Sequence, residues 1–437
     1  MRLKKHEVEI NNAECVTAPA AWTHSAGEDD ETRSGVSAAP VQLTAKMREE
    51  IIAAIDLTRV QSAGQPALDV AAFAAKVRAI ATVRTAALWL KSSQGLPPTA
   101  PVAPMHIVLR NDVSVEPAQT SRPFDHSAAD KAVLREWAAD MQAAGKLVRA
   151  APGPTSGRAF VVTDSDGKGR VVSTHPQLND ALIVGDAVMV GVEAIQAAVA
   201  ASDVHFAATI DLASAFFQLP VDRRSQPLLR VRVDDAIYMY TVAAMGVASS
   251  PIHLQNLLNN TLADCVGTFA HVDDVVVVAS TAGQLLERVD AVLAALQRVG
   301  LRAASNKIVI SNTKIPILGN VVDLQEHHIE PNNDGVEQLR NLAQPETVTQ
   351  LRLALSLAAH VSRFNPLVTA AAAPLRALIP PRAPKGSKRK VQWTEGTERA
   401  WERLLGVLAE KAVLVAQDPA RPVAILSDAS KVGAAAM

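Results

Sequence analysis

The chain has 437 residues, 49% of them apolar, which is too long for one ordinary domain and sufficient to bury several cores. Its formal net charge of −1 excludes a strong overall attraction to nucleic acid, so any basic surface must be local. No apolar run approaches the roughly 18 residues of a membrane span. The charged start has no apolar stretch behind it, so we expect no signal peptide and an intracellular, cytoplasmic or nuclear, location.

In chain order, residues 1–104 form the first expected region, and they carry no motif of known chemistry. Residues 1–45 are polar and lack periodicity, which predicts disorder. Apolar residues at helical spacing predict two helices, around residues 47–55 and 73–87. The Pro-rich stretch 95–104 predicts a linker and a domain boundary.

From residue 105 onward, helical patterns alternate with short apolar strands and hairpin turns, which predicts an α+β fold with antiparallel strands. A mostly helical stretch follows, then a basic linker and a last segment. The expected elements are a helix capped by Ser127, a hairpin over 159–173, a helix after Pro251, a helix over 285–300 closed by Gly300, and a hairpin over 315–329.

The most informative stretch holds two adjacent acids, Asp273 and Asp274, between two apolar, largely β-branched runs. This pattern is typical of a tight β-hairpin with carboxylates at its tip. Paired carboxylates repel each other unless a cation lies between them. Asp211 ends another apolar strand, and a third acid from a second strand would complete a set able to hold two divalent metals for nucleotidyl transfer. Taken alone, the acid pair could also be a solvated hairpin tip.

These residues resemble the reverse transcriptases of LTR retrotransposons, especially the gypsy-type Pol polyprotein. The resemblance covers residues 105–437 in colinear order, which is more specific than any single motif. The matching stretches are Arg170 with Leu178-Asn179, Asp211 to Gln218, Ala244 to Gln255, His271-Val272-Asp273-Asp274, Asn306-Lys307, Ile317-Leu318-Gly319 and, near the end, Ser427-Asp428-Ala429-Ser430.

The resemblance implies a right-hand polymerase with an antiparallel palm sheet, followed by the start of a ribonuclease H-like α/β domain. Fingers and palm are expected over 105–330, a thumb or connection over 331–382, and a truncated ribonuclease H-like segment over 383–437. The implied activity is that of an RNA-directed DNA polymerase. Its partners would be an RNA or DNA template with a primer and deoxynucleoside triphosphates, with no membrane involved.

The resemblance also implies roles for single residues. Asp211, Asp273 and Asp274 would hold two Mg²⁺ ions (Mn²⁺ being an alternative), with the Leu212 carbonyl as a further ligand. Asp428 would be a metal ligand of the ribonuclease H remnant, without activity because its partner acids are missing. The expected nucleotide contacts are Arg170 and Lys307 on the phosphates, Phe216 under the sugar as a gate against a 2′-hydroxyl, and Met245 and Gly246 lining the pocket.

Each of these nucleotide contacts has an ordinary structural alternative: an exposed strand arginine, a surface lysine, a core aromatic or a core methionine. The chain also departs from the family pattern. His271 replaces an aromatic residue, and His175 and Pro176 stand where an aromatic and an arginine are usual. A decayed retroelement relic that binds nucleic acid or protein without turnover therefore stays open. An RNA-templated RNA polymerase is a further alternative, which Phe216 argues against.

Overall fold

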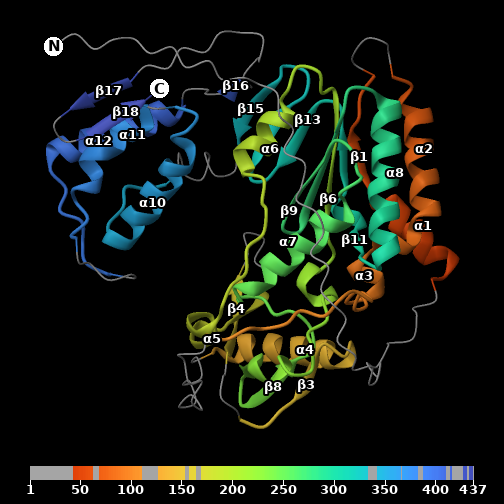
Figure 1. The fold of residues 1–437 in the computed structure, drawn as a ribbon. Helices are drawn as coiled ribbons and strands as arrows, with labels where there is room; N and C mark the ends of the chain where they lie inside the picture. The colour runs from red at the N-terminus through yellow and green to blue at the C-terminus, as the bar shows by residue number, and fades with distance from the viewer. Residues whose placement is uncertain are drawn as a thin grey trace, which may run out of the picture. The chain divides into compact units, whose positions relative to one another are not determined.

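The computed structural model describes residues 43–62, 68–110, 126–152, 157–163, 169–332, 342–365, 367–381, 387–409, 414–415, 427–430 and 433–436 (Figure 1). The disorder predicted over residues 1–45 therefore falls almost wholly outside the described residues. Within the described part of the chain, no helix has the length and apolar character needed to cross a bilayer.

The paired acids lie on a central five-stranded sheet. β6 pairs antiparallel with β10 on one side and with β12 on the other, and β1 pairs parallel with β12. The valines of β10 are buried because helices and a neighbouring sheet cover both faces. The strand order is β1 (Asp56–Arg59), β12 (Val309–Ser311), β6 (Phe206–Asp211), β10 (Asp274–Ala279), β9 (Thr268–His271).

Helices α7 (Ser249–Thr261) and α8 (Ala282–Val299) pack beside this sheet. α8 buries one apolar face and ends at Gly300, whose φ of +79° permits the left-handed C-cap. Helix α2 (Val70–Val83) lies along α8 (Figure 1), and helix α1 (Ala45–Ala53) packs against α2. Short elements complete this side: η1 (Thr85–Ala87), β2 (Leu88–Trp89) paired with β11 (Ala303–Ala304), α3 (Lys91–Gln94) and η4 (Ser305–Lys307).

A second five-stranded sheet is covered by helix α4 (Ala128–Ala143), whose N-cap Ser127 accepts a hydrogen bond from the Asp130 amide at 3.1 Å. Short helical elements connect this sheet with the central one. The strand order is β3 (Leu147–Arg149), β8 (Ala236–Tyr240), β7 (Arg230–Val233), β4 (Gly157–Thr163), β5 (Gly169–Thr174), and the connecting elements are α5 (Pro176–Ala181), α6 (Val192–Val199), η2 (Ala215–Gln218) and η3 (Gln226–Leu228).

The C-terminal part contains a third sheet and a helical cluster. β13 (Lys314–Ile317), β14 (Asn320–Asp323) and β15 (His328–Pro331) form an antiparallel meander, and β16 (Leu414–Val415) adds to it. Helices α10 (Val348–Val361), α11 (Leu367–Arg376) and α12 (Glu395–Ala409) share a separate apolar core. β17 (Ser427–Ser430) pairs with β18 (Gly433–Ala436).

Most of the predicted elements are present. The helix after Pro251, the helix closed by Gly300 and both predicted hairpins are confirmed. The α+β class is confirmed as well. The domain boundary predicted near residue 104 stays a prediction, but packing across it is continuous: Ile51 and Phe73 belong to the same buried cluster as Val275.

Candidate active site

The three acids singled out from the sequence lie at one end of the β6–β10 ladder. Asp211, the last residue of β6, stands directly opposite Asp274, the first residue of β10. Residues facing each other in an antiparallel pair have Cβ atoms about 5 Å apart. The Leu212 amide donates to the Asp273 carbonyl at 3.0 Å, which ties the turn to the end of β6. The fold therefore brings Asp211 opposite Asp274, which lies 63 positions later in the chain.

Val272 and Asp273 form the two-residue turn between β9 and β10. Val272 has a φ of +55°. A β-branched residue is a true outlier in this region, and the backbone cost is about 1–2 kcal/mol. A conformation of this kind persists only where neighbouring contacts hold it.

Lys307 reaches the same place from η4. Its ammonium lies 2.9 Å from Oδ1 and 3.0 Å from Oδ2 of Asp211, and its side chain is 59% exposed while that of Asp211 is 19% exposed. Because the lysine is largely in water, the pair adds little to stability.

The acids carry more negative charge than the neighbouring cations balance. Burial, followed by the charges of Asp273 and Asp211, raises the pKa of Asp274 to about 6. Burial also raises the pKa of Asp211, partly offset by Lys307 and Arg170. Within the described residues, neither Asp273 nor Asp274 forms an ion pair. Carboxylate oxygens with an uncompensated charge, next to the Leu212 main chain, form a donor set that fits Mg²⁺.

Two of the predicted nucleotide contacts lie near the acids. Arg170, in β5, is exposed and close enough for its charge to lower the pKa of Asp211. Phe216 lies in η2, five positions after Asp211, half-buried against the main core. Phe216 is therefore partly buried and partly exposed, and its role as a gate against a 2′-hydroxyl stays a prediction.

Met245 and Gly246 form a loop that is bound to β5 and α5. The Ser173 hydroxyl donates to the Met245 carbonyl at 2.8 Å, and the Asn179 amide donates to the Gly246 carbonyl at 2.8 Å. The Ala248 amide donates back to Asn179 Oδ1 at 3.0 Å. The sequence predicts no role for Asn179, which is part of the Leu178-Asn179 pair; in the structure its side chain supports this loop.

Asp428 lies in β17, where the described residues fix the backbone but not the side chain. Its predicted role as a metal ligand is therefore outside the described residues.

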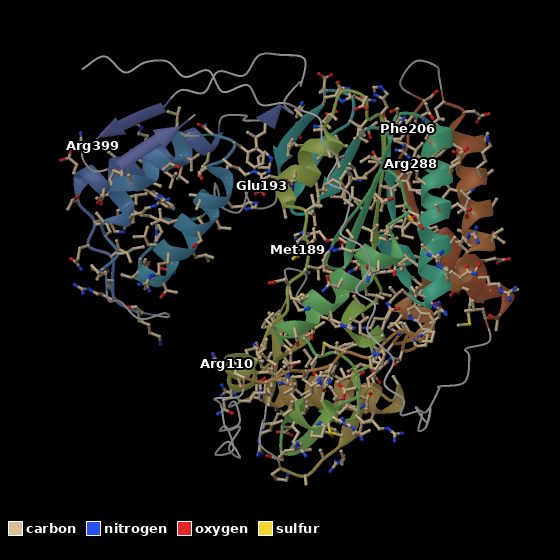
Figure 2. The ribbon with its side chains drawn as sticks, in the orientation of Figure 1. Arg110, Met189, Glu193, Phe206, Arg288 and Arg399 are labelled. Atoms are coloured by element: carbon tan, nitrogen blue, oxygen red, sulfur yellow. The ribbon has the colours of Figure 1, made fainter. Side chains whose placement is uncertain are left out.

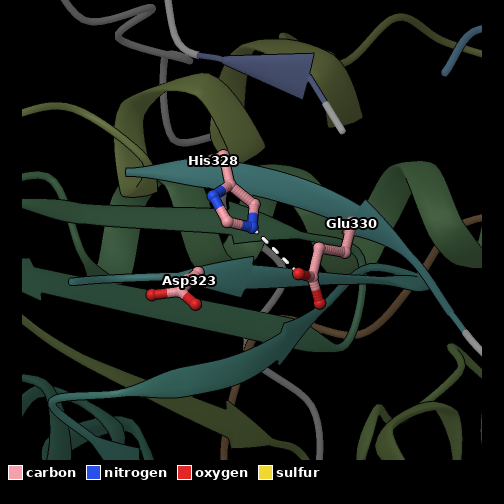
Figure 3. Close-up of side chains that lie close together, drawn as sticks. All are labelled: Asp323, His328 and Glu330. Carbon is pink, nitrogen blue, oxygen red and sulfur yellow. Dashed lines mark hydrogen bonds and ion pairs between the residues drawn. The ribbon is translucent and has the colours of Figure 1, made fainter. Parts of the chain in front are cut away.

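A second group of possible metal ligands lies on the β14–β15 hairpin (Figure 3). One ligand atom each of Asp323, His328 and Glu330 lies within 4.8 Å of the others. Lys314 already supplies a positive charge here, 2.8 Å from Glu330 and 3.6 Å from Asp323. His328 Nε2 is 2.9 Å from Glu330. Lys314 therefore balances part of the charge of Asp323 and Glu330, whereas neither Asp273 nor Asp274 forms an ion pair among the described residues.

Comparison with known proteins finds similar sequences for the stretch that contains this site. Residues 158–322 match the family model described as "Reverse transcriptase (RNA-dependent DNA polymerase)". The "Transposon Tf2-3 polyprotein" of Schizosaccharomyces pombe is 22% identical over 232 residues, 52% of this chain and 17% of that protein. The "Gag-Pol polyprotein" of Walleye dermal sarcoma virus is 22% identical over 236 residues, 53% of this chain and 13% of that protein. The matches thus span less than a fifth of these curated relatives.

Solved structures show the same fold. A foamy viral protease-reverse transcriptase in complex with double-stranded DNA aligns with a TM-score of 0.71 at 17% identity, covering 92% of this chain and 66% of that chain. The same kind of protein in complex with an RNA/DNA hybrid aligns with a TM-score of 0.72, covering 92% and 50%. Residues 158–322 therefore match the reverse-transcriptase family, and the chain has the polymerase fold of these solved structures, as the sequence predicted.

Proposed function

We propose that this chain is an RNA-directed DNA polymerase of a retroelement, of the gypsy type, acting inside the cell on a primer paired with an RNA or DNA template. The observation that carries the proposal is the pairing of Asp211 with Asp274 inside the stretch that matches the reverse-transcriptase family. The uncompensated charge of these acids supports a two-metal site. Mg²⁺ bound there would make the primer 3′-hydroxyl a better nucleophile and neutralise the triphosphate.

The protein residues would bind and orient the reactants. Asp211, Asp273 and Asp274, with the Leu212 carbonyl, would hold the ions, for which Mn²⁺ is an alternative. At neutral pH a carboxyl with a pKa of about 6 is mostly ionised, so Asp274 is ready to bind a cation. The primer 3′-hydroxyl would attack the α-phosphate of the deoxynucleoside triphosphate, and pyrophosphate would leave.

The basic residues would bind the triphosphate. Arg170 can bind phosphate oxygens with two parallel hydrogen bonds. Lys307 would exchange Asp211 for the β- or γ-phosphate, and its 59% exposure leaves it free to move. Phe216 would lie under the sugar and reject a 2′-hydroxyl, and Met245 and Gly246 would line the pocket. Asp428 would belong to a ribonuclease H-like segment.

Primer extension on poly(rA)/oligo(dT) with Mg²⁺ tests the activity. We expect extension by the unchanged protein and a loss of about 10³-fold or more in the double variant Asp273→Asn, Asp274→Asn. Asp203→Asn, at an exposed aspartate outside the site, is the matched control and should keep the full rate. Absence of extension with intact duplex binding would favour the relic instead.

Two further measurements test the individual assignments. Mg²⁺ should raise the melting temperature of the unchanged protein but not of the double variant, because a ligand bound only by the folded state stabilises it. Phe216→Ala should increase ribonucleotide incorporation; unchanged sugar selectivity would remove Phe216 from the proposal.

A further inference from the structure

We propose that Gln255 is a positioning residue for the turn that carries Asp273 and Asp274. This inference rests on the proposed function, because it concerns the same acids. Gln255 lies on α7, and its side chain is 0% exposed. Gln255 ends one of the stretches that resemble the family, Ala244 to Gln255, but the sequence predicts no chemical role for it.

The amide of Gln255 binds the backbone of the turn at two points. Its Oε1 accepts a hydrogen bond from the Val272 amide at 2.7 Å. Its Nε2 donates to the Ala270 carbonyl at 3.0 Å. A primary amide offers one acceptor and two donors, so it can bind a backbone N–H and a backbone C=O together. Gln255 therefore holds the last part of β9 and the first residue of the turn in one arrangement.

This contact acts where the backbone needs support. Val272 adopts a positive φ of +55°, which its β-branched side chain disfavours. Its amide is the one held by Gln255. On the other side of the turn, the Leu212 amide holds the Asp273 carbonyl at 3.0 Å. Gln255 of α7 thus holds the first residue of the turn, and the amide of Leu212, the residue after β6, holds the second.

A neighbouring asparagine sets which way the Gln255 amide faces. Gln255 Nε2 also donates to Asn259 Oδ1 at 2.8 Å, and Asn259 Nδ2 donates to the Val188 carbonyl at 2.8 Å. A flipped Gln255 would turn its NH₂ group toward the Val272 N–H and lose these bonds. The orientation that serves the turn is therefore fixed by a relay that starts at the backbone of Val188.

The far end of this relay is an extended segment before α6 on which Met189 lies (Figure 2). Asn256 Nδ2 donates to the Asp186 carbonyl at 3.0 Å, and His271 Nδ1 lies 3.3 Å from the Val190 carbonyl. α7 therefore joins the segment 186–190 to the turn that carries the acids: its side chains bind main-chain atoms at both ends, and the Gln255–Asn259 bond connects them.

Gln255→Met tests the inference, because methionine keeps the length and volume but neither accepts from Val272 nor donates to Ala270. We expect kcat for primer extension to fall about 10–100-fold, as for a catalytic group displaced by about 1 Å. The KM for the nucleotide and the Kd for the primer–template duplex should change little. Thr261→Val, a buried hydroxyl on the same helix whose bond stays within α7, is the matched control.

Two readouts do not depend on turnover. Hydrogen exchange of the Val272 amide should become about tenfold faster in Gln255→Met, because its acceptor is gone. The Mn²⁺ concentration for half-saturation, followed by electron paramagnetic resonance of free Mn²⁺, should rise severalfold. The control Thr261→Val should show neither change.

An unchanged extension rate in folded Gln255→Met, or unchanged exchange at Val272, would overturn the inference. If the variant fails to fold, Asn259→Ala replaces it, with the same expected directions and smaller effects. If the unchanged protein extends no primer, the proposed function fails. The positioning role is then judged by hydrogen exchange and Mn²⁺ binding alone.

Discussion

His175 is buried to 2% exposure and packs edge-on against Tyr240, with ring centroids 6.2 Å apart. Neither ring nitrogen has a hydrogen-bond partner among the described residues. A Cβ on Gly157 would lie 2.4 Å from the ring, so the glycine permits this close approach. His175 stands where the family usually has an aromatic residue, and its ring packs in the core as an aromatic side chain would.

Burial lowers the pKa of His175 from 6.5 to about 4. Between these values the unfolded chain binds a proton that the folded chain lacks, so stability is lost as the pH falls through this window. The loss attributable to His175 reaches about 3 kcal/mol near pH 4. We expect His175→Phe to remove this acid-dependent loss of stability. Urea unfolding of both proteins at pH 7.5, 6 and 5 measures it.

Wild type and His175→Phe should therefore differ increasingly in the free energy of unfolding as the medium is acidified. His360→Asn, at an exposed histidine on α10, should keep the pH dependence of the wild type. A difference that stays constant from pH 7.5 to 5 would contradict the assigned pKa.

The residue scale also shows what the sequence could predict about the site. Asp211, Asp273 and Asp274 follow from local patterns, since each borders an apolar strand. The contact between Lys307 and Asp211 does not follow from such patterns, because the two residues are 96 positions apart in the chain. The positive φ of Val272 was equally hidden, since valine is the residue type least expected there.

At the scale of elements, the loop of Met245 and Gly246 connects β8 to α7 and lies against β5. Gly246 has a φ of +76°, and an added Cβ would lie 2.2 Å from the Ser173 carbonyl oxygen. Because that obstacle is backbone, it cannot rotate away. We expect Gly246→Ala to lower the free energy of unfolding by about 2 kcal/mol or more, measured by urea denaturation.

Gly406→Ala is the matched control, because Gly406 is exposed inside α12 and an added Cβ would meet nothing within 4 Å. Alanine there should raise stability by about 0.5–1 kcal/mol through helix propensity. Equal effects of the two substitutions would show that the loop geometry at Gly246 is not what constrains that position.

Sequence periodicity predicts where helices and strands lie better than it predicts which elements pair with one another. The pattern around residues 285–300 predicted the end of α8 at Gly300, while the helix begins three residues earlier, at Ala282; its apolar face and its Gly300 cap are both local signals. β1 was missed: only four residues long, it pairs with β12 some 250 positions away, and no local pattern reports such a partner.

On the scale of the whole molecule, the N-terminal helices are part of the polymerase core. Ile51 and Phe73 are 0% and 3% exposed. Arg84 forms a two-bond ion pair with Asp290 of α8, at 2.7 and 2.9 Å. β1 covers the edge of β12. These contacts make residues 43–62 and 68–94 a structural part of the sheet that holds the acids, although they carry no motif.

We therefore expect a chain that begins at residue 105 to unfold at a lower urea concentration than the full chain and to aggregate, because the face of α8 and the edge of β12 become exposed. Each large buried side chain lost costs about 2–5 kcal/mol. A chain beginning at Ala38 keeps every contact described above and should match the full chain. Light scattering and urea unfolding are measured for the full chain, the chain from Ala38 and the chain from residue 105. A cooperative transition at the full-length midpoint for the chain from residue 105 would mean that the central sheet closes without β1 and the first helices, and that the Pro-rich stretch is a true domain boundary.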